Sequence, residues 1–124
     1  MRMDSIGLLQ IKWESEMREG LEKLLAAGKD SALLRLGLGN ACQSEGDLLA
    51  AEAHLRRAVE MDARYTAAWK QLGRVLLANG RLDQARSALE QGLAVAREHG
   101  DKQAEKEMSV FLKRALKGLE SDNK

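Results

Sequence analysis

The side chains best suited to metal binding or nucleophilic chemistry are one cysteine and two histidines, Cys42, His54 and His99. A metal site needs several Cys, His or carboxylate ligands at short spacing, and these histidines lie in different halves of the chain. Cys42 shares a helical stripe with Leu38, which predicts a buried, inert thiol. No H-E-x-x-H or G-x-S-x-G motif is present. We therefore expect no metal, no cofactor and no enzymatic activity.

The charges are balanced, with 20 Lys and Arg against 19 Asp and Glu and a net charge of +1. Such a chain has no global field that would attract nucleic acid or anionic lipid. The basic run of His54, Arg56, Arg57 and Arg64 lacks an accompanying row of aromatic residues. We interpret this run as a solvated outer face and expect no nucleic-acid partner.

Cysteine usage and the first residues bear on location. A single cysteine excludes an intrachain disulfide and suits a reducing compartment. The opening stretch MRMDSIGLLQIKW carries Asp4, and its apolar run is too short for a secretory signal or a membrane span. These features favour a cytoplasmic protein with no membrane partner.

An internal repeat dominates the middle of the chain. One repeat length is the separation between Leu38 and Leu72. When the sequence is shifted along itself by this length, two sets of residues align: Leu38, Gly39, Gly46, Leu48, Ala51 and Leu55 fall on Leu72, Gly73, Gly80, Leu82, Ala85 and Leu89. Each copy has helix-period apolar residues on both sides of a central glycine. One copy is therefore a helical hairpin, which must stack on a neighbour to cover its apolar faces.

The whole domain is predicted to be α-helical, because the chain has no proline, 3% aromatic residues and abundant strong helix formers. Ser31, Asp47 and Asp101 are the expected N-caps. Ile6, Leu9 and Trp13 have helical spacing, which would let the first segment dock on the first helix. The predicted segments are a lead-in at 1–13, one domain at 14–119 and a frayed end at 120–124, with six helices at about 14–27, 31–44, 48–60, 66–78, 82–97 and 101–119. The two repeat units span about 32–65 and 66–99, and the outer helices cap them.

Small residues fall where each hairpin needs a close approach. Gly39 and Ala51 lie on facing sides of one turn, and Gly73 and Ala85 on facing sides of the other. Ala58 and Gly92 leave room for the helix that follows each hairpin. A bulky residue at Gly73 or Ala85 is expected to overpack the contact, at a cost of about 1 to 3 kcal/mol.

The repeated residues resemble the tetratricopeptide repeat (TPR), whose pattern is W-x2-L-G-x2-Y followed by A-x3-F and a closing proline. The second copy matches at Trp69, Leu72, Gly73, Leu76, Gly80, Ala85 and Leu89. The first copy has Arg35 in the tryptophan slot, and Ala63 and Arg97 stand where the closing prolines would be. We interpret Trp69 as a core residue and Tyr65 as a packing wedge between the units.

The resemblance implies a right-handed superhelix whose first helices line a concave groove that binds peptides or proteins, without catalytic residues. By that pattern the groove residues include Asn40, Gln43, Lys70, Gln71, Arg74, Lys106 and Lys113. The basic members could hold a carboxylate by charge-assisted hydrogen bonds. Chaperone-binding members use a similar clamp, and Asn40 matches one clamp asparagine. Leu36 and Gln71 depart from the other clamp positions.

The expected function is a non-catalytic protein-interaction module that binds a peptide in the concave groove, with a preference for acidic or C-terminal segments. The alternative is a structural protein that associates with itself as a homodimer. Its interface would be an exposed end face, either the Ile6–Trp13 segment or the Met108–Leu116 stripe.

Overall fold

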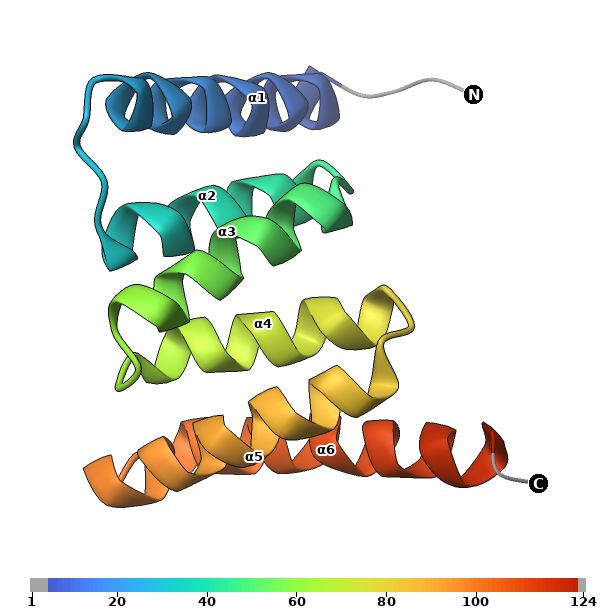
Figure 1. Cartoon of the computed structure of the whole chain (residues 1–124). Coiled ribbons are helices and arrows are strands. Elements are labelled where there is room, and N and C mark those ends of the chain that lie inside the picture. The colour runs from blue at the N-terminus through green and yellow to red at the C-terminus, as the bar shows by residue number, and fades with distance from the viewer. Residues whose placement is uncertain (1–4, 123–124) are drawn as a thin grey trace.

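The computed structural model describes residues 5–122, and the side chains of residues 5, 6, 8 and 11 lie outside that description. Six helices are stacked in chain order, and the first and last of them lie at opposite ends of the stack (Figure 1). The described residues contain no strand, so the predicted all-α stack of helical hairpins is confirmed. The helices are α1 (Ser5–Ala26), α2 (Ala32–Ser44), α3 (Leu48–Met61), α4 (Thr66–Ala78), α5 (Leu82–His99) and α6 (Lys102–Asp122).

The expected caps define three helix starts. The Ser31 side chain accepts a hydrogen bond from the Leu34 amide at 3.0 Å, and Asp47 accepts one from the Ala50 amide at 3.3 Å. Asp101 caps α6 in the same way, at 3.0 Å from the Ala104 amide. The turns inside the two hairpins use Gly46 and Gly80, whose φ angles of 80° and 74° disfavour any residue with a side chain.

The ends of the stack differ from the expected boundaries. α1 begins at Ser5 rather than near Glu14, so Leu9 and Trp13 belong to this helix instead of docking on it. Both side chains are exposed, and the Ile6 side chain lies outside the described residues. α6 continues to Asp122, so much of the segment predicted to fray is helical. Helix-period spacing at residues 6, 9 and 13 fits one continuous helix as well as a separate segment.

Each hairpin closes where a glycine of the first helix meets a leucine of the second. A Cβ atom on Gly39 would lie 2.5 Å from Cγ of Leu55, and one on Gly73 would overlap Leu89. The side chain nearest to each of these glycines is therefore a leucine of the second helix. Ala51 and Ala85 are also fully buried, which keeps the two helices together along their length.

The core runs continuously from α2 to α6. Trp69 is buried as predicted, and its Nε1 donates to the Ala63 carbonyl at 2.8 Å. This bond ties down the proline-free connector between the units. Met108 is fully buried, and Phe111 and Leu112 pack against the core. The Met108–Leu116 stripe thus faces the interior over most of its length, and Leu116, at its end, is 46% exposed. Most of the stripe is therefore part of the core, and little of it is exposed for self-association.

Candidate functional site

A polar hollow of about 290 Å³ lies between the first helices of the two hairpins. Its walls are Asn40, Gln43 and Ser44 from the C-terminal half of α2, and Gln71 and Arg74 from the middle of α4. Gln43 Nε2 donates to Gln71 Oε1 at 3.1 Å across the two helices. The amide groups of Asn40 and Gln71 and the Arg74 guanidinium can offer donors to a peptide backbone or a carboxylate. Four of the seven predicted groove residues therefore meet in one place.

Arg74 is the cationic member of this hollow. Its side chain is exposed, and it makes no hydrogen bond or ion pair within residues 5–122. It also lines a second hollow on its other side, together with Leu77, Ala78, Phe111 and Arg114. The Arg114 guanidinium lies 5.8 Å from the centre of the Phe111 ring. Arg74 thus stands between a polar hollow and a more apolar one.

Lys70 is occupied by an acidic partner. Its Nζ lies 2.7 Å from Glu107 Oε2 on α6, and Gln103 donates to the other oxygen of that carboxylate at 2.9 Å. The Lys70 ammonium, with help from Gln103, lowers the pKa of Glu107 below the ordinary glutamate value. The pair joins α4 to α6 and neutralises one of the cations that we expected to face a ligand.

Lys106 and Lys113 line a different hollow, formed by one face of α6 with Lys102, Glu105, Ser109 and Val110. The predicted cluster of four cations is therefore divided among an exposed Arg74, a paired Lys70 and a separate α6 surface. The reason lies in the length of α5, which has 18 residues where α3 has 14. This difference takes α6 out of the repeat register. Arg114, which lines the hollow beside Arg74, was not among the predicted groove residues.

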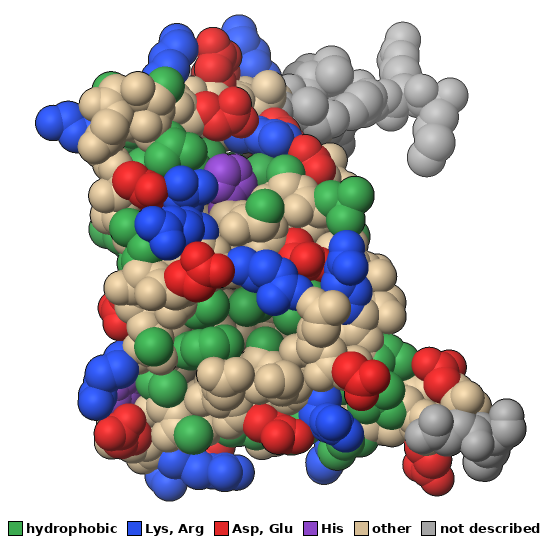
Figure 2. Space-filling view, viewed as in Figure 1, with side chains coloured by type: hydrophobic (Ala, Val, Ile, Leu, Met, Phe, Trp, Pro, Cys, Tyr) green, Lys and Arg blue, Asp and Glu red, His purple; other side chains and the backbone are tan. Residues whose placement is uncertain are grey.

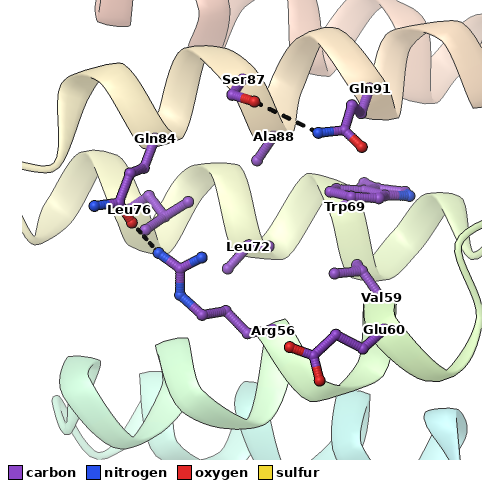
Figure 3. A pocket seen from close by; sticks show the side chains of 10 residues that line it. All are labelled: Arg56, Val59, Glu60, Trp69, Leu72, Leu76, Gln84, Ser87, Ala88 and Gln91. Atoms are coloured by element: carbon purple, nitrogen blue, oxygen red, sulfur yellow. Dashed lines mark hydrogen bonds between the residues drawn. The ribbon is translucent and has the colours of Figure 1, made fainter.

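Another face of the stack has a hollow of about 260 Å³ that is lined by residues of α3, α4 and α5, with α4 running between the other two helices (Figure 3). Val59, Trp69, Leu72, Leu76 and Ala88 form its apolar lining, and these residues also belong to the core. Arg56 and Gln84 are hydrogen-bonded to each other across one end. The hollow is a shallow opening onto the core between two second helices.

The basic run on this face is matched by acidic or polar partners. Arg57 pairs with Glu60 and Arg64 with Glu98, both at 3.3 Å, and Arg56 pairs with Glu52 at 3.2 Å. Acidic and basic side chains are intermixed on the face shown in Figure 2. Such pairing leaves little excess positive charge for a phosphate backbone.

The remaining reactive groups are buried or paired. Cys42 is fully buried, and desolvation raises the pKa of its thiol, which disfavours the thiolate. Burial also lowers the pKa of His54, whose Nδ1 lies 3.2 Å from the Arg35 guanidinium. The described residues hold no group of three or more Cys, His, Asp or Glu placed to bind a metal ion. Within that same part of the chain, no helix combines the length and the hydrophobicity that a membrane crossing requires.

Comparisons with known proteins agree with this architecture. The family described as "Tetratricopeptide repeat" matches residues 43–105. The "TPR repeat-containing protein PA0015" of Pseudomonas aeruginosa is 58% identical over 98 residues, which cover 79% of this chain and 93% of that protein.

Solved structures give the same result. Protein BPP2914 from Bordetella parapertussis is 44% identical, with a TM-score of 0.70 over 82% of this chain and 88% of that one. The TPR2B-domain:pHsp70 complex of yeast Sti1 is 13% identical and shares the fold, with a TM-score of 0.79 over 88% and 87% of the two chains. Proteins with this repeat generally act as non-catalytic modules for protein–protein interaction. The chain belongs to the tetratricopeptide repeat family.

Proposed function

We propose that the surface formed by α2, α4 and α6 binds an extended segment of a protein partner that carries an acidic side chain or a free C-terminal carboxylate. The observation that supports this most is Arg74, an exposed guanidinium without a partner in the described residues. It stands at the junction of the two hollows. A carboxylate there would gain charge-assisted hydrogen bonds.

The neighbouring groups suit the rest of such a peptide. Asn40 and Gln71 can pair with backbone amides and carbonyls, while Leu77 and Phe111 offer an apolar contact on the other side of Arg74. The Sti1 domain, which has the same fold, was solved as a complex with pHsp70. We place this interaction in the cytoplasm, because the lone buried Cys42 suits a reducing compartment.

The contribution of Lys70, Lys106 and Lys113 is secondary in this proposal. Lys70 must leave Glu107 before it can meet a ligand, and that exchange removes much of the gain. Lys106 and Lys113 would contact only a peptide that continues beyond Arg114 along α6. They are expected to affect the association rate through long-range attraction more than the affinity.

The test is fluorescence polarisation with a short labelled peptide rich in Asp, Glu and Leu, offered with a free and with an amidated C-terminus. Arg74→Ala is expected to weaken binding about tenfold or more, since hydrogen bonds to charged groups contribute about 1.5 to 3 kcal/mol. Arg86→Ala, an exposed arginine of α5, is the matched control and should bind like the wild type. Equal binding by wild type and Arg74→Ala would reject this site.

A further inference from the structure

A stripe of exposed apolar residues runs along α1. Leu9 is 60% exposed, Trp13 68%, Met17 52% and Leu24 48%. Their spacing places them on one face of the helix, where Gly20 fills the gap between Met17 and Leu24. This bare stripe, defined as Leu9, Trp13, Met17, Gly20 and Leu24, has four of the nine large hydrophobic residues found exposed in the described structure.

The repeat explains why the stripe is bare. Met17 and Leu24 lie one repeat length before Ala51 and Ala58, which are fully buried in the second helix of a complete hairpin. α1 therefore holds the position of a second helix, and no described helix holds the position of its first helix. Leu33 of α2 is 71% exposed, and its counterpart in the next copy is Ala67, a half-buried residue of α4. Both helices thus border an empty helix position.

We propose that α1 of a second copy of this chain occupies that position, antiparallel to the first, so that two bare stripes cover each other. The two helices of a hairpin are antiparallel, and a twofold axis perpendicular to α1 would give the α1 pair the same orientation. This interface is independent of the peptide surface proposed above, because none of its residues lines the hollows around Arg74.

Gly20 supplies the place for a close approach. In both complete hairpins a glycine receives a leucine of the opposite helix, at Gly39 and Gly73. A Cβ atom on Gly20 would have nothing within 4 Å, so this position is open to the large side chain of another helix. The indole of Trp13 in the second copy is the largest side chain of the stripe and is expected to fill it.

The stripe is complementary to itself in that arrangement. When Trp13 lies opposite Gly20 of the second copy, Leu9 lies opposite Leu24, because both pairs are separated by the same step along the helix. Met17 then lies close to the twofold axis. Both signs of charge, on Lys12, Glu16, Glu19 and Lys23, flank the stripe, so pairing does not gather charge of one sign. The buried area would be on the order of 1,000 Å², near the lower limit for a specific interface, which predicts a dimer in exchange with monomer.

Analytical ultracentrifugation over a concentration series tests the proposal. The wild type is expected to dimerise with concentration, and Trp13→Glu to remain monomeric. At concentrations where the wild type is also monomeric, the two should have the same melting temperature, since Trp13 is exposed. Leu49→Glu replaces an apolar residue that is 66% exposed on α3, and this control should dimerise like the wild type. A wild type that stays monomeric at every concentration would overturn the proposal, as would a Trp13→Glu variant that still dimerises.

Two further variants test the antiparallel fit. Gly20→Leu makes the stripe more apolar and strengthens the helix, yet it closes the space for Trp13 and should weaken dimerisation. Tighter association of Gly20→Leu would indicate nonspecific hydrophobic association and would reject the proposed packing of Trp13 against Gly20. A mixture of Leu9→Cys and Leu24→Cys copies should form a disulfide between unlike copies under mild oxidation. Preferential linking of Leu9→Cys to itself would indicate a parallel pair and also reject it.

Discussion

Two charged clusters join successive units of the stack at equivalent places in the repeat, with the charge reversed at three of the four positions. In the first, Arg18 of α1 contacts Glu22, Glu45 and Asp47 at 2.7, 2.8 and 3.1 Å. In the second, Glu52 of α3 contacts Arg81, Arg56 and Asn79 at 2.7, 3.2 and 3.2 Å. Each member of the second cluster lies one repeat length after its counterpart: Arg18, Glu22, Glu45 and Asp47 correspond to Glu52, Arg56, Asn79 and Arg81.

The comparison shows that the repeat preserves the place of a contact without preserving its side chains. In both clusters the central residue of a second helix reaches the turn of the next hairpin. The reversed sign also disfavours a wrong order of stacking, because α1 placed on the second hairpin would bring Arg18 to Arg81. Like charges at such a contact oppose the wrong pairing, as charged positions do in coiled coils.

The central residues of the two clusters, Glu52 and Arg18, differ in burial and in how their neighbours shift their pKa values. The Glu52 side chain is 12% exposed, and the Arg18 side chain is 24% exposed. Burial alone would raise the pKa of Glu52, but hydrogen bonds from Asn79 and Arg56 lower it overall. The carboxylates of Glu45, Glu22 and Asp47 raise the pKa of Arg18. The second cluster should therefore tolerate disruption less well than the first.

The largest effect is expected from Glu52→Arg, which gives the second cluster the central residue of the first. The new guanidinium would face Arg56 and Arg81 at a largely buried site. The expected loss is about 3 to 5 kcal/mol of the free energy of unfolding, because it leaves charges without a partner. Urea denaturation followed by circular dichroism measures it. A loss no greater than that of a surface substitution would mean that Glu52 does not hold the units together.

Arg18→Glu is the reciprocal change and should cost less, roughly 1 to 3 kcal/mol, since this centre is more exposed. The new carboxylate would face three other carboxylates across the α1 contact. Hydrogen exchange should show the loss concentrated in α1, with α4 and α5 protected as in the wild type. Uniform loss of protection along the chain would contradict a cluster that acts on α1 alone.

Giving the turn residue at position 81 a charge opposite to that of the new Arg at position 52 should recover part of the unfolding free energy lost in Glu52→Arg. Arg81→Asp combined with Glu52→Arg places Arg opposite Asp, as Arg18 stands opposite Asp47. A coupling of about 1 to 2 kcal/mol is expected in a double-mutant cycle by urea denaturation. Adding Arg56→Glu gives the second cluster the charges of Arg18, Glu22 and Asp47, with Asn79 left in the place of Glu45, and should recover more. Strict additivity of the two single changes would show that the residues at 52 and 81 do not interact.

Acid should reduce the contribution of Arg18. The Ala50 amide and the Arg18 guanidinium lower the pKa of Asp47 in the folded state. A carboxyl group with a depressed folded pKa stabilises the fold above its unfolded pKa of about 4 and loses that contribution as the pH falls through the folded value. The difference in unfolding free energy between wild type and Arg18→Ala, about 1 kcal/mol at pH 7, should therefore shrink as the pH falls below about 4. A difference that is constant with pH would place the effect in packing by the arginine stem.

The fold was predictable because the residues that build the hairpins are the same in both copies of the repeat. The contacts of the two charged clusters were not predictable, because different residues make them in each copy. Gly39 and Gly73, or Ser31 and Asp47 as caps, are read from residue type and spacing alone. Arg18 and Glu52 are opposite in charge, so an alignment of the two copies presents them as a mismatch. The candidate site divides similarly: Gln43 and Gln71 follow from the helix faces, whereas the Lys70–Glu107 pair depends on how α6 leaves the repeat register.

The smallest effect is expected at the third equivalent position, Arg86 of α5. It lies one repeat length after Glu52, but α6 is continuous where a turn would carry the partners, and Ala115 takes the place of Arg81. Arg86 instead lies near Asp83 and Glu90 of its own helix, at 3.9 and 3.7 Å, with its side chain 46% exposed. Arg86→Ala should change the free energy of unfolding by less than about 0.5 kcal/mol. If Arg86→Ala lowered the free energy of unfolding as much as Arg18→Ala does in the same urea titration, a charged residue at this position of the repeat would stabilise the fold even without partners on a turn. A negligible loss would show that stabilisation requires a turn that presents opposite charges.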